Sequence, residues 1–215
     1  MSKEEVARSL SSSTLAGVFI SLGASAALAA PNKSVGALIF TLGLTAVLTF
    51  RVDLFTGKCG YLLTERYKKQ YLAYLARVWL GNLFGCICVA AVLKGTTINN
   101  GFLSTYQDKL TELVRVKGAG TAITSILCGA LMYIAVDGFK RQSKINPMLG
   151  CVCYISAVTA FIMCGYEHCV ACMFYFVLAG MSWSNLIFLG IVTLGNMIGS
   201  SFIHLLLTQL EKPRA

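Results

Sequence analysis

A single ionisable side chain inside a long apolar stretch most constrains what this chain can fold into. Between Lys144 and Glu211 the only Asp, Glu, Lys or Arg is Glu167, and it stands next to His168. About 20 consecutive apolar residues are enough for a helix to span a bilayer, and this stretch exceeds that length. An ionisable pair is costly in hydrocarbon and by default marks a pathway, a relay or a ligand site. The stretch therefore predicts a membrane helix that breaks at a histidine facing a pore.

The rest of the composition extends this prediction to the whole chain. Of 215 residues, 56% are hydrophobic and 13% are charged, and the mean hydropathy is +0.71. A soluble domain carries about 25% charged residues. We therefore expect an all-α membrane protein whose residues 1–215 form one domain in contact with the lipid bilayer. The net charge of +9 lies mainly in short loops, where it sets topology, so no nucleic-acid partner is expected.

The apolar segments predict six transmembrane helices, of which the second and fifth are broken. Polar residues Arg51–Lys58 interrupt the second helix before Cys59–Leu63 resumes it, and Cys164–His168 interrupts the fifth. The first thirteen residues are expected to form an interfacial helix, and Lys94–Lys117 a long polar loop. The six helices are expected at about Leu15–Ala30, Val35–Phe50, Tyr71–Leu93, Gly118–Val136, Pro147–Leu178 and Trp183–Leu207.

An even number of spans places both termini on one side of the membrane. If that side is the cytoplasm, the cytoplasmic segments hold twelve Lys and Arg residues and the outer loops hold five. Lys and Arg are enriched in the cytoplasmic loops of membrane proteins. We therefore expect a multi-pass protein of the cell (inner) membrane with both termini in the cytoplasm.

The two halves of the chain, about residues 14–94 and 118–208, repeat one pattern. Each half reads as a helix, a broken helix, and a helix carrying Gly-Asn-x-x-Gly, at Gly81–Gly85 and Gly195–Gly199. Three spans per half give the two copies opposite orientations. Interrupted helices at matching positions of inverted halves point to a substrate site at the bilayer midplane. Non-helical backbone at that depth is tolerated only inside protein or along a cavity, so the two breaks are expected to meet.

Five motifs together resemble the formate/nitrite transporter family over nearly the whole chain. Gly165-Tyr166-Glu167-His168, followed by Ala171 and Met173-Phe174, is similar to the most diagnostic motif of that family. The other motifs are Gly17-Val18-Phe19-Ile20-Ser21, Asp53-Leu54-Phe55-Thr56-Gly57, Gly81-Asn82-Leu83-Phe84-Gly85 and Gly195-Asn196-Met197-Ile198-Gly199.

The resemblance implies an aquaporin-like protomer with its own pore, built as an inverted 3+3 repeat and assembled as a homopentamer. It also implies transport of small monovalent anions such as formate, nitrite, hydrosulfide, acetate or lactate, often with a proton. Thr56 would lie opposite His168 at the pore centre, with Glu167 beside it. The outer apolar constriction would contain Phe40 and Phe161, and the inner one Leu44 and Leu54.

The sequence departs from the family pattern at three positions. Gly129 and Cys172 stand where the family has asparagines, which removes two amide groups from the expected pore wall. The family lysine before the fourth helix falls on Leu113, while Lys117 and Arg115 are near it and are expected to attract anions. These changes leave the identity of the anion open.

Other interpretations of these residues compete with a pore. A histidine in apolar sequence is often hydrogen-bonded core, and Thr56 alone fits a helix cap. His168-Cys169 with Cys172 suggests zinc, but a zinc site requires four ligands and no second Cys-x-x-Cys pair exists, so no metal is expected. The sequence contains no Gly-rich phosphate loop, nucleophile elbow or paired carboxylates, which disfavours an enzyme and predicts no cofactor.

Two functions from other classes remain open beside anion transport. One is a channel for a small neutral solute such as ammonia or water, and the other is a non-transporting redox or metal membrane protein. For anion transport, the cost of desolvation is several kcal/mol for an ion, so a weak acid crosses an apolar constriction most easily as the neutral molecule. A proton then reaches the anion from the central pore histidine, His168, or through water. Burial also favours the neutral imidazole of His168 at rest, hydrogen-bonded to Thr56 or Glu167.

Overall fold

The protein is described by a computed structural model that covers residues 3–96, 102–115 and 120–211. All regular secondary structure within these residues is helical. The long helices are α1 (Lys3–Ala29), α2 (Lys33–Thr49), α3 (Lys68–Gly95), α6 (Gly120–Gln142), α7 (Pro147–Cys164), α8 (Cys169–Ala179) and α9 (Trp183–Leu210). The shorter ones are η1 (Phe55–Gly57), η2 (Cys59–Leu63), α4 (Phe102–Thr105) and α5 (Gln107–Val114).

Among the described residues, five helices are long and apolar enough to cross a membrane: α1, α3, α6, α7 and α9. Helices α2 and α8 are apolar but shorter. Many large apolar side chains on the outside are exposed, as expected where lipid rather than water surrounds a protein. They include Leu38, Leu42, Phe84, Ile123, Ile187, Leu194 and Phe202. The expected all-helical membrane architecture agrees with this structure.

Three expectations about individual elements were wrong. Helix α1 is continuous from Lys3, because no proline interrupts its hydrogen bonds. The expected loop of residues 94–117 contains α4 and α5, and α5 buries Leu110 against the bundle. The segment Cys59–Leu63 forms 3₁₀ turns rather than a second half-helix. Such turns are common in short segments, and Gly60 disfavours an α-helix there.

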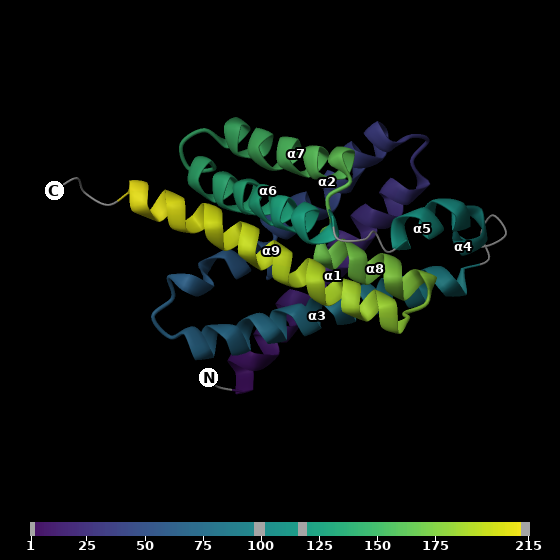
Figure 1. The fold of residues 1–215 in the computed structure, drawn as a ribbon, viewed down its shortest axis with the longest axis horizontal. Coiled ribbons are helices and arrows are strands. Elements are labelled where there is room, and N and C mark those ends of the chain that lie inside the picture. The colour runs from purple at the N-terminus through teal and green to yellow at the C-terminus, as the bar shows by residue number, and fades with distance from the viewer. Residues whose placement is uncertain (1–2, 97–101, 116–119, 212–215) are drawn as a thin grey trace.

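The helix pairings of the first half recur in the second half. Helix α1 packs on α2 and α3, and α6 packs on α7 and α9 in the same way. The halves join where α2 meets α7, where α3 meets α8 and where α9 meets η2. Figure 1 shows that the start of α1 and the end of α9 lie toward the end of the molecule opposite α4 and α5.

Two glycines at equivalent places let these helices approach closely. A Cβ on Gly17 would lie 2.1 Å from the carbonyl oxygen of Asn82, and a Cβ on Gly129 would lie 2.2 Å from that of Asn196. Gly129 therefore lies in the α6–α9 contact. Its position does not support the interpretation of Gly129 as a pore wall residue that has lost an amide, because a side chain there would collide with α9.

Candidate functional site

The break between α7 and α8 begins with a glycine in the left-handed conformation. Gly165 has φ of 68°, and its N–H donates to the carbonyl of Ile162 at 3.1 Å. The N–H of Tyr166 donates to the carbonyl of Phe161 at 2.9 Å. This pair of hydrogen bonds is the Schellman ending of a helix, which satisfies carbonyls that a helix end leaves free. The backbone then runs without regular structure to His168.

The break after α2 has the same ending, but an arginine occupies the glycine position. Arg51 has φ of 54°, and its N–H donates to the carbonyl of Leu48 at 3.3 Å. The N–H of Val52 donates to the carbonyl of Val47 at 3.1 Å. For a residue with a Cβ, the left-handed backbone conformation is about 1–2 kcal/mol less stable than the right-handed one. Arg51 therefore carries this cost. Gly165, its counterpart in the other half, has no Cβ and does not.

The first break is held by the side chain of Asn82 in α3, which is fully buried. Its Oδ1 accepts a hydrogen bond from the N–H of Phe55 at 2.9 Å. Its Nδ2 donates to the carbonyls of Ser13 and Asp53 at 2.8 and 3.0 Å. One amide therefore bonds three backbone groups, two of them in the break.

Asn196 in α9 holds the second break through the same three contacts. Its Oδ1 accepts from the N–H of Cys169 at 2.9 Å. Its Nδ2 donates to the carbonyls of Ser125 and Glu167 at 2.8 and 2.9 Å. The Gly-Asn-x-x-Gly motifs entered the sequence analysis as markers of the repeat and of the family resemblance. Their asparagines also fix the non-helical backbone that carries the candidate site.

Thr56 and His168 meet between the two breaks. Thr56 Oγ1 lies 2.9 Å from His168 Nε2, and the side chains are buried, with exposed fractions of 1% and 2%. His168 Nδ1 accepts a hydrogen bond from the N–H of Ala171 at 3.2 Å, and so caps the N-terminus of α8. An accepting Nδ1 carries no proton, so the neutral imidazole holds its proton on Nε2 and donates it to Thr56.

Aromatic side chains surround one side of this pair. The ring of Phe161 stacks on His168 at 5.6 Å, and Phe40 meets Phe161 edge to face at 5.7 Å. They line a cavity of about 90 Å³, here called the histidine pocket. It is lined by Ala27, Phe40, Leu113, Phe161, Ile162, Gly165, Tyr166, Glu167, His168, Ala171, Cys172 and Tyr175. None of these residues is a lysine or an arginine.

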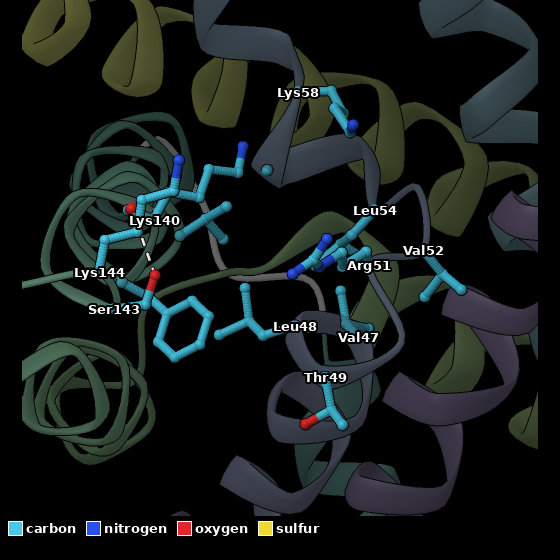
Figure 2. A pocket seen from close by; sticks show the side chains of 13 residues that line it. Val47, Leu48, Thr49, Arg51, Val52, Leu54, Lys58, Lys140, Ser143 and Lys144 are labelled. Atoms are coloured by element: carbon cyan, nitrogen blue, oxygen red, sulfur yellow. Dashed lines mark hydrogen bonds between the residues drawn. The ribbon is translucent and has the colours of Figure 1, made fainter. Parts of the chain in front are cut away.

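A larger cavity of about 660 Å³ lies at the first break, here called the basic cavity. Leu54 and Gly57, which flank Thr56 closely in sequence, line it. Figure 2 shows the cationic side chains that surround it. The full lining is Val47, Leu48, Thr49, Arg51, Val52, Leu54, Gly57, Lys58, Val136, Phe139, Lys140, Ser143 and Lys144. This grouping could not be predicted from the sequence, because these residues are distant along the chain.

The remaining predicted residues divide between the two cavities and the core. Cys172 donates to Glu167 Oε2 at 3.4 Å, and both line the histidine pocket. Leu44 is buried in the apolar core with 1% exposure and lines neither cavity. Arg115 is exposed and does not line the histidine pocket. Lys117 lies outside the described residues.

Leu113 takes the place at the histidine pocket where the resemblance led us to look for a lysine. Its helix α5 is tied to the bundle by Lys109, whose Nζ donates to the carbonyls of Leu28 and Ala30. Within the described part of the chain, no group of three or more His, Cys, Asp or Glu residues is placed to hold a metal ion. The site therefore offers hydrogen-bond donors and apolar walls.

A family model and two curated proteins match this chain. The model of the formate/nitrite transporter family matches residues 2–209. The probable formate transporter of Methanothermobacter thermautotrophicus is 28% identical over 199 residues, which cover 79% of this chain and 71% of that protein. The formate channel FocA of Haemophilus influenzae is 30% identical over 176 residues, which cover 74% of this chain and 60% of that protein.

Two solved structures share the fold. An FNT family ion channel has a TM-score of 0.79 and 24% identity, and the match covers 95% of this chain and 90% of that one. A pentameric formate channel with formate bound has a TM-score of 0.79 and 20% identity, and the match covers 98% of each chain. At these identities the two structures establish the fold alone.

Proposed function

Because this chain belongs to the formate/nitrite transporter family, we propose that it moves a small monovalent anion, or its weak acid, past the Thr56–His168 pair. The observation that carries the proposal is the 2.9 Å contact between these buried side chains, with a cavity on either side. Formate is the first substrate to test, since both curated relatives carry formate in their names. Nitrite, hydrosulfide, acetate and lactate belong to the same class.

The anion enters a cavity with its water and loses that water at the apolar residues around His168. Desolvation disfavours the charged form, so the proton affinity of the anion rises as it goes deeper. The Nε2–H of His168 and the hydroxyl of Thr56 are hydrogen-bond donors for the anion at that point. A proton from the bulk solution, relayed through water, then neutralises the anion, and the neutral acid passes Phe161. His168 stays neutral, because a second proton on Nδ1 would break its hydrogen bond from Ala171 and place a positive charge at the positive end of a helix.

The proposal includes the finer architecture. Residues of about 14–94 and 118–208 are two inverted repeats that together give six spans, the two with broken helices being aquaporin-like half-spans that meet at Thr56 and His168. The equivalent bonds of Asn82 and Asn196 support this arrangement. The protein would be a homopentamer in the cell (inner) membrane with both termini in the cytoplasm. The pentamer is inferred from the name of one structural neighbour.

A channel for a small neutral solute is the second candidate, and the histidine pocket favours it. That pocket has apolar and aromatic walls, the carboxyl group of Glu167 and no cation among the described residues that line it. An anion is not attracted to such a surface, whereas ammonia or water enters without electrostatic cost. The basic cavity on the other side favours the anion, so the two cavities support different candidates.

Flux into proteoliposomes separates these functions. The purified protein is tested with formate, nitrite, hydrosulfide, acetate, lactate and ammonia at two pH values, with empty liposomes as the control. Anion transport predicts flux of at least one anion that rises with an inward proton gradient and falls when a second anion competes. Flux of ammonia or water that changes with neither the proton gradient nor a competing anion, without anion flux, would instead support a channel for a neutral solute.

A further inference from the structure

The basic cavity gathers four cationic side chains from two separate parts of the chain. Arg51 lies just beyond α2 and Lys58 lies between η1 and η2. Lys140 lies near the end of α6 and Lys144 just beyond it. All four line one cavity of about 660 Å³. Figure 2 shows Lys140 and Lys144 on the side of the cavity opposite Arg51, with Lys58 above. A volume between about 300 and 1,000 Å³ is typical of pockets for small organic ligands.

The positive charge of this cavity is only partly neutralised within the protein. Lys58 Nζ makes a salt bridge with Asp53 at 2.9 Å. Lys140 Nζ has a neutral partner, since it donates to the hydroxyl of Tyr61 at 3.3 Å and lies over that ring. In the described ranges no carboxylate makes a salt bridge with Arg51, Lys140 or Lys144. Three cations therefore remain for a ligand.

The backbone at Arg51 gives a second, independent observation. The left-handed conformation there satisfies the helix end equally well with glycine, as Gly165 demonstrates at the equivalent end of α7. Arginine at this position raises the energy of the backbone but places a guanidinium group in the lining of the cavity. A guanidinium presents a planar set of donors that matches the oxygens of carboxylate and phosphate groups in pairs.

We propose that the basic cavity binds a phosphate-class oxyanion carrying two or more negative charges. A single monovalent anion would leave two of the three cations uncompensated, whereas a multivalent oxyanion neutralises them together. The cavity is also much larger than the roughly 30 Å³ that one water molecule occupies in the liquid. The ligand would be either a soluble phosphate compound or the headgroup of an anionic phospholipid.

The position of the cavity gives this ligand a regulatory effect, which rests on the proposed function. Leu54 and Gly57 line the cavity and flank Thr56, so an occupant of the cavity lies across the route to His168. Monovalent anions crossing from that side must displace it. The bound oxyanion therefore slows anion flux and is less effective at high concentrations of the transported anion.

Titration calorimetry with inorganic pyrophosphate and the purified full chain in detergent tests the binding. We expect one site per chain, and affinity reduced about tenfold or more in Arg51→Gly and in Lys140→Gln, since each loses a charge-assisted hydrogen bond. Arg51→Gly suits this test because glycine keeps the left-handed backbone. The control is Lys68→Gln, an exposed lysine at the start of α3 outside the cavity, which should bind as the unaltered protein does.

Further arms identify the source of the ligand and separate the two proposals. Binding to vesicles with phosphatidic acid but not to pyrophosphate, again weakened by Arg51→Gly, would support the same site with a lipid ligand. Binding of neither, or binding that Arg51→Gly and Lys140→Gln leave unchanged, would overturn the site. Absent anion flux in proteoliposomes would remove the proposed function and leave the binding result standing. Normal flux that pyrophosphate on either side fails to slow would overturn the regulatory effect.

Discussion

The two breaks are held by equivalent hydrogen bonds, but their surroundings differ. Each follows a helix that ends in a left-handed residue, Arg51 or Gly165, and each is held by a buried asparagine. After the first break the chain forms the 3₁₀ turns η1 and η2, whereas after the second it forms the eleven-residue helix α8. At the start of α8 the N–H of Ala171 donates to the imidazole of His168, whereas Leu54, at the start of η1, makes no such side-chain cap. The comparison shows that a repeated backbone can support two unlike cavities.

The largest expected effect comes from removing either asparagine. Asn82→Ala removes the partner of the Phe55 N–H and the Asp53 carbonyl, and Asn196→Ala that of the Cys169 N–H and the Glu167 carbonyl, at about 1–3 kcal/mol for each group. We expect both variants to lower the thermal midpoint in detergent strongly and by similar amounts. Asn32→Ala is the matched control, because Asn32 makes one exposed cap bond worth about 1 kcal/mol. A large fall in the thermal midpoint for only one of the two variants would show that the two asparagines do not hold their breaks equally.

The next effect tests the close helix contacts of the two halves. Gly129→Asn restores the amide that the family resemblance led us to expect, but a Cβ there lies 2.2 Å from Asn196 O. We expect destabilisation by about 1–3 kcal/mol or misfolding, as for other overpacked cores. Gly17→Ala, at the equivalent contact, should show the same sign. The yield and the thermal midpoint of each variant measure this destabilisation. A stable Gly129→Asn with altered anion flux would return that residue to the pore wall.

A smaller effect concerns the contact between the breaks. Thr56→Val keeps the shape of the side chain but removes the oxygen that lies 2.9 Å from His168 Nε2. The imidazole N–H then lacks that partner, which costs about 1–3 kcal/mol. Formate flux in proteoliposomes should fall, while Thr56→Ser should retain most of it. Equal flux for Val and Ser would mean that the hydroxyl takes no part.

The smallest effect compares the two left-handed positions. Arg51→Gly should raise the free energy of unfolding by about 1 kcal/mol because glycine adopts this backbone freely. Gly165→Ala should lower it by a similar amount, since no atom lies near the added Cβ and only the backbone is strained. Thermal midpoints of both variants test the opposite signs. The same sign for both would indicate that Arg51 stabilises the fold through contacts of its side chain.

The positions of the breaks could be predicted from sequence, because a charge inside apolar sequence beside Gly165, or at Arg51–Lys58, is incompatible with an ordinary membrane helix. The Thr56–His168 pair came from the family resemblance. Spacing alone does not bring together two residues that are far apart in the chain.

Other features needed coordinates for the same reason. Asn82 and Asn196 were recognisable as polar residues in apolar helices, but their partners lie 27 to 71 residues away. Arg51 was interpreted only as part of the interruption of the second helix and Lys140 only as a signal of membrane orientation, since nothing local shows that they share a cavity. Helix α5 was missed because a short amphipathic segment resembles a polar loop until its apolar face meets α8.

The central claim is that the imidazole of His168 lies on the transport route, and His168→Asn tests it most directly. Asparagine is a good N-cap, so α8 should still form while the Nε2–H is lost. Formate flux into proteoliposomes is measured between pH 5 and 8 for both proteins. We predict at least about a tenfold loss of flux, which is the effect of losing one hydrogen bond to a charged group, or loss of the pH dependence of the flux. Flux of His168→Asn that matches the unaltered protein at every pH would contradict the claim.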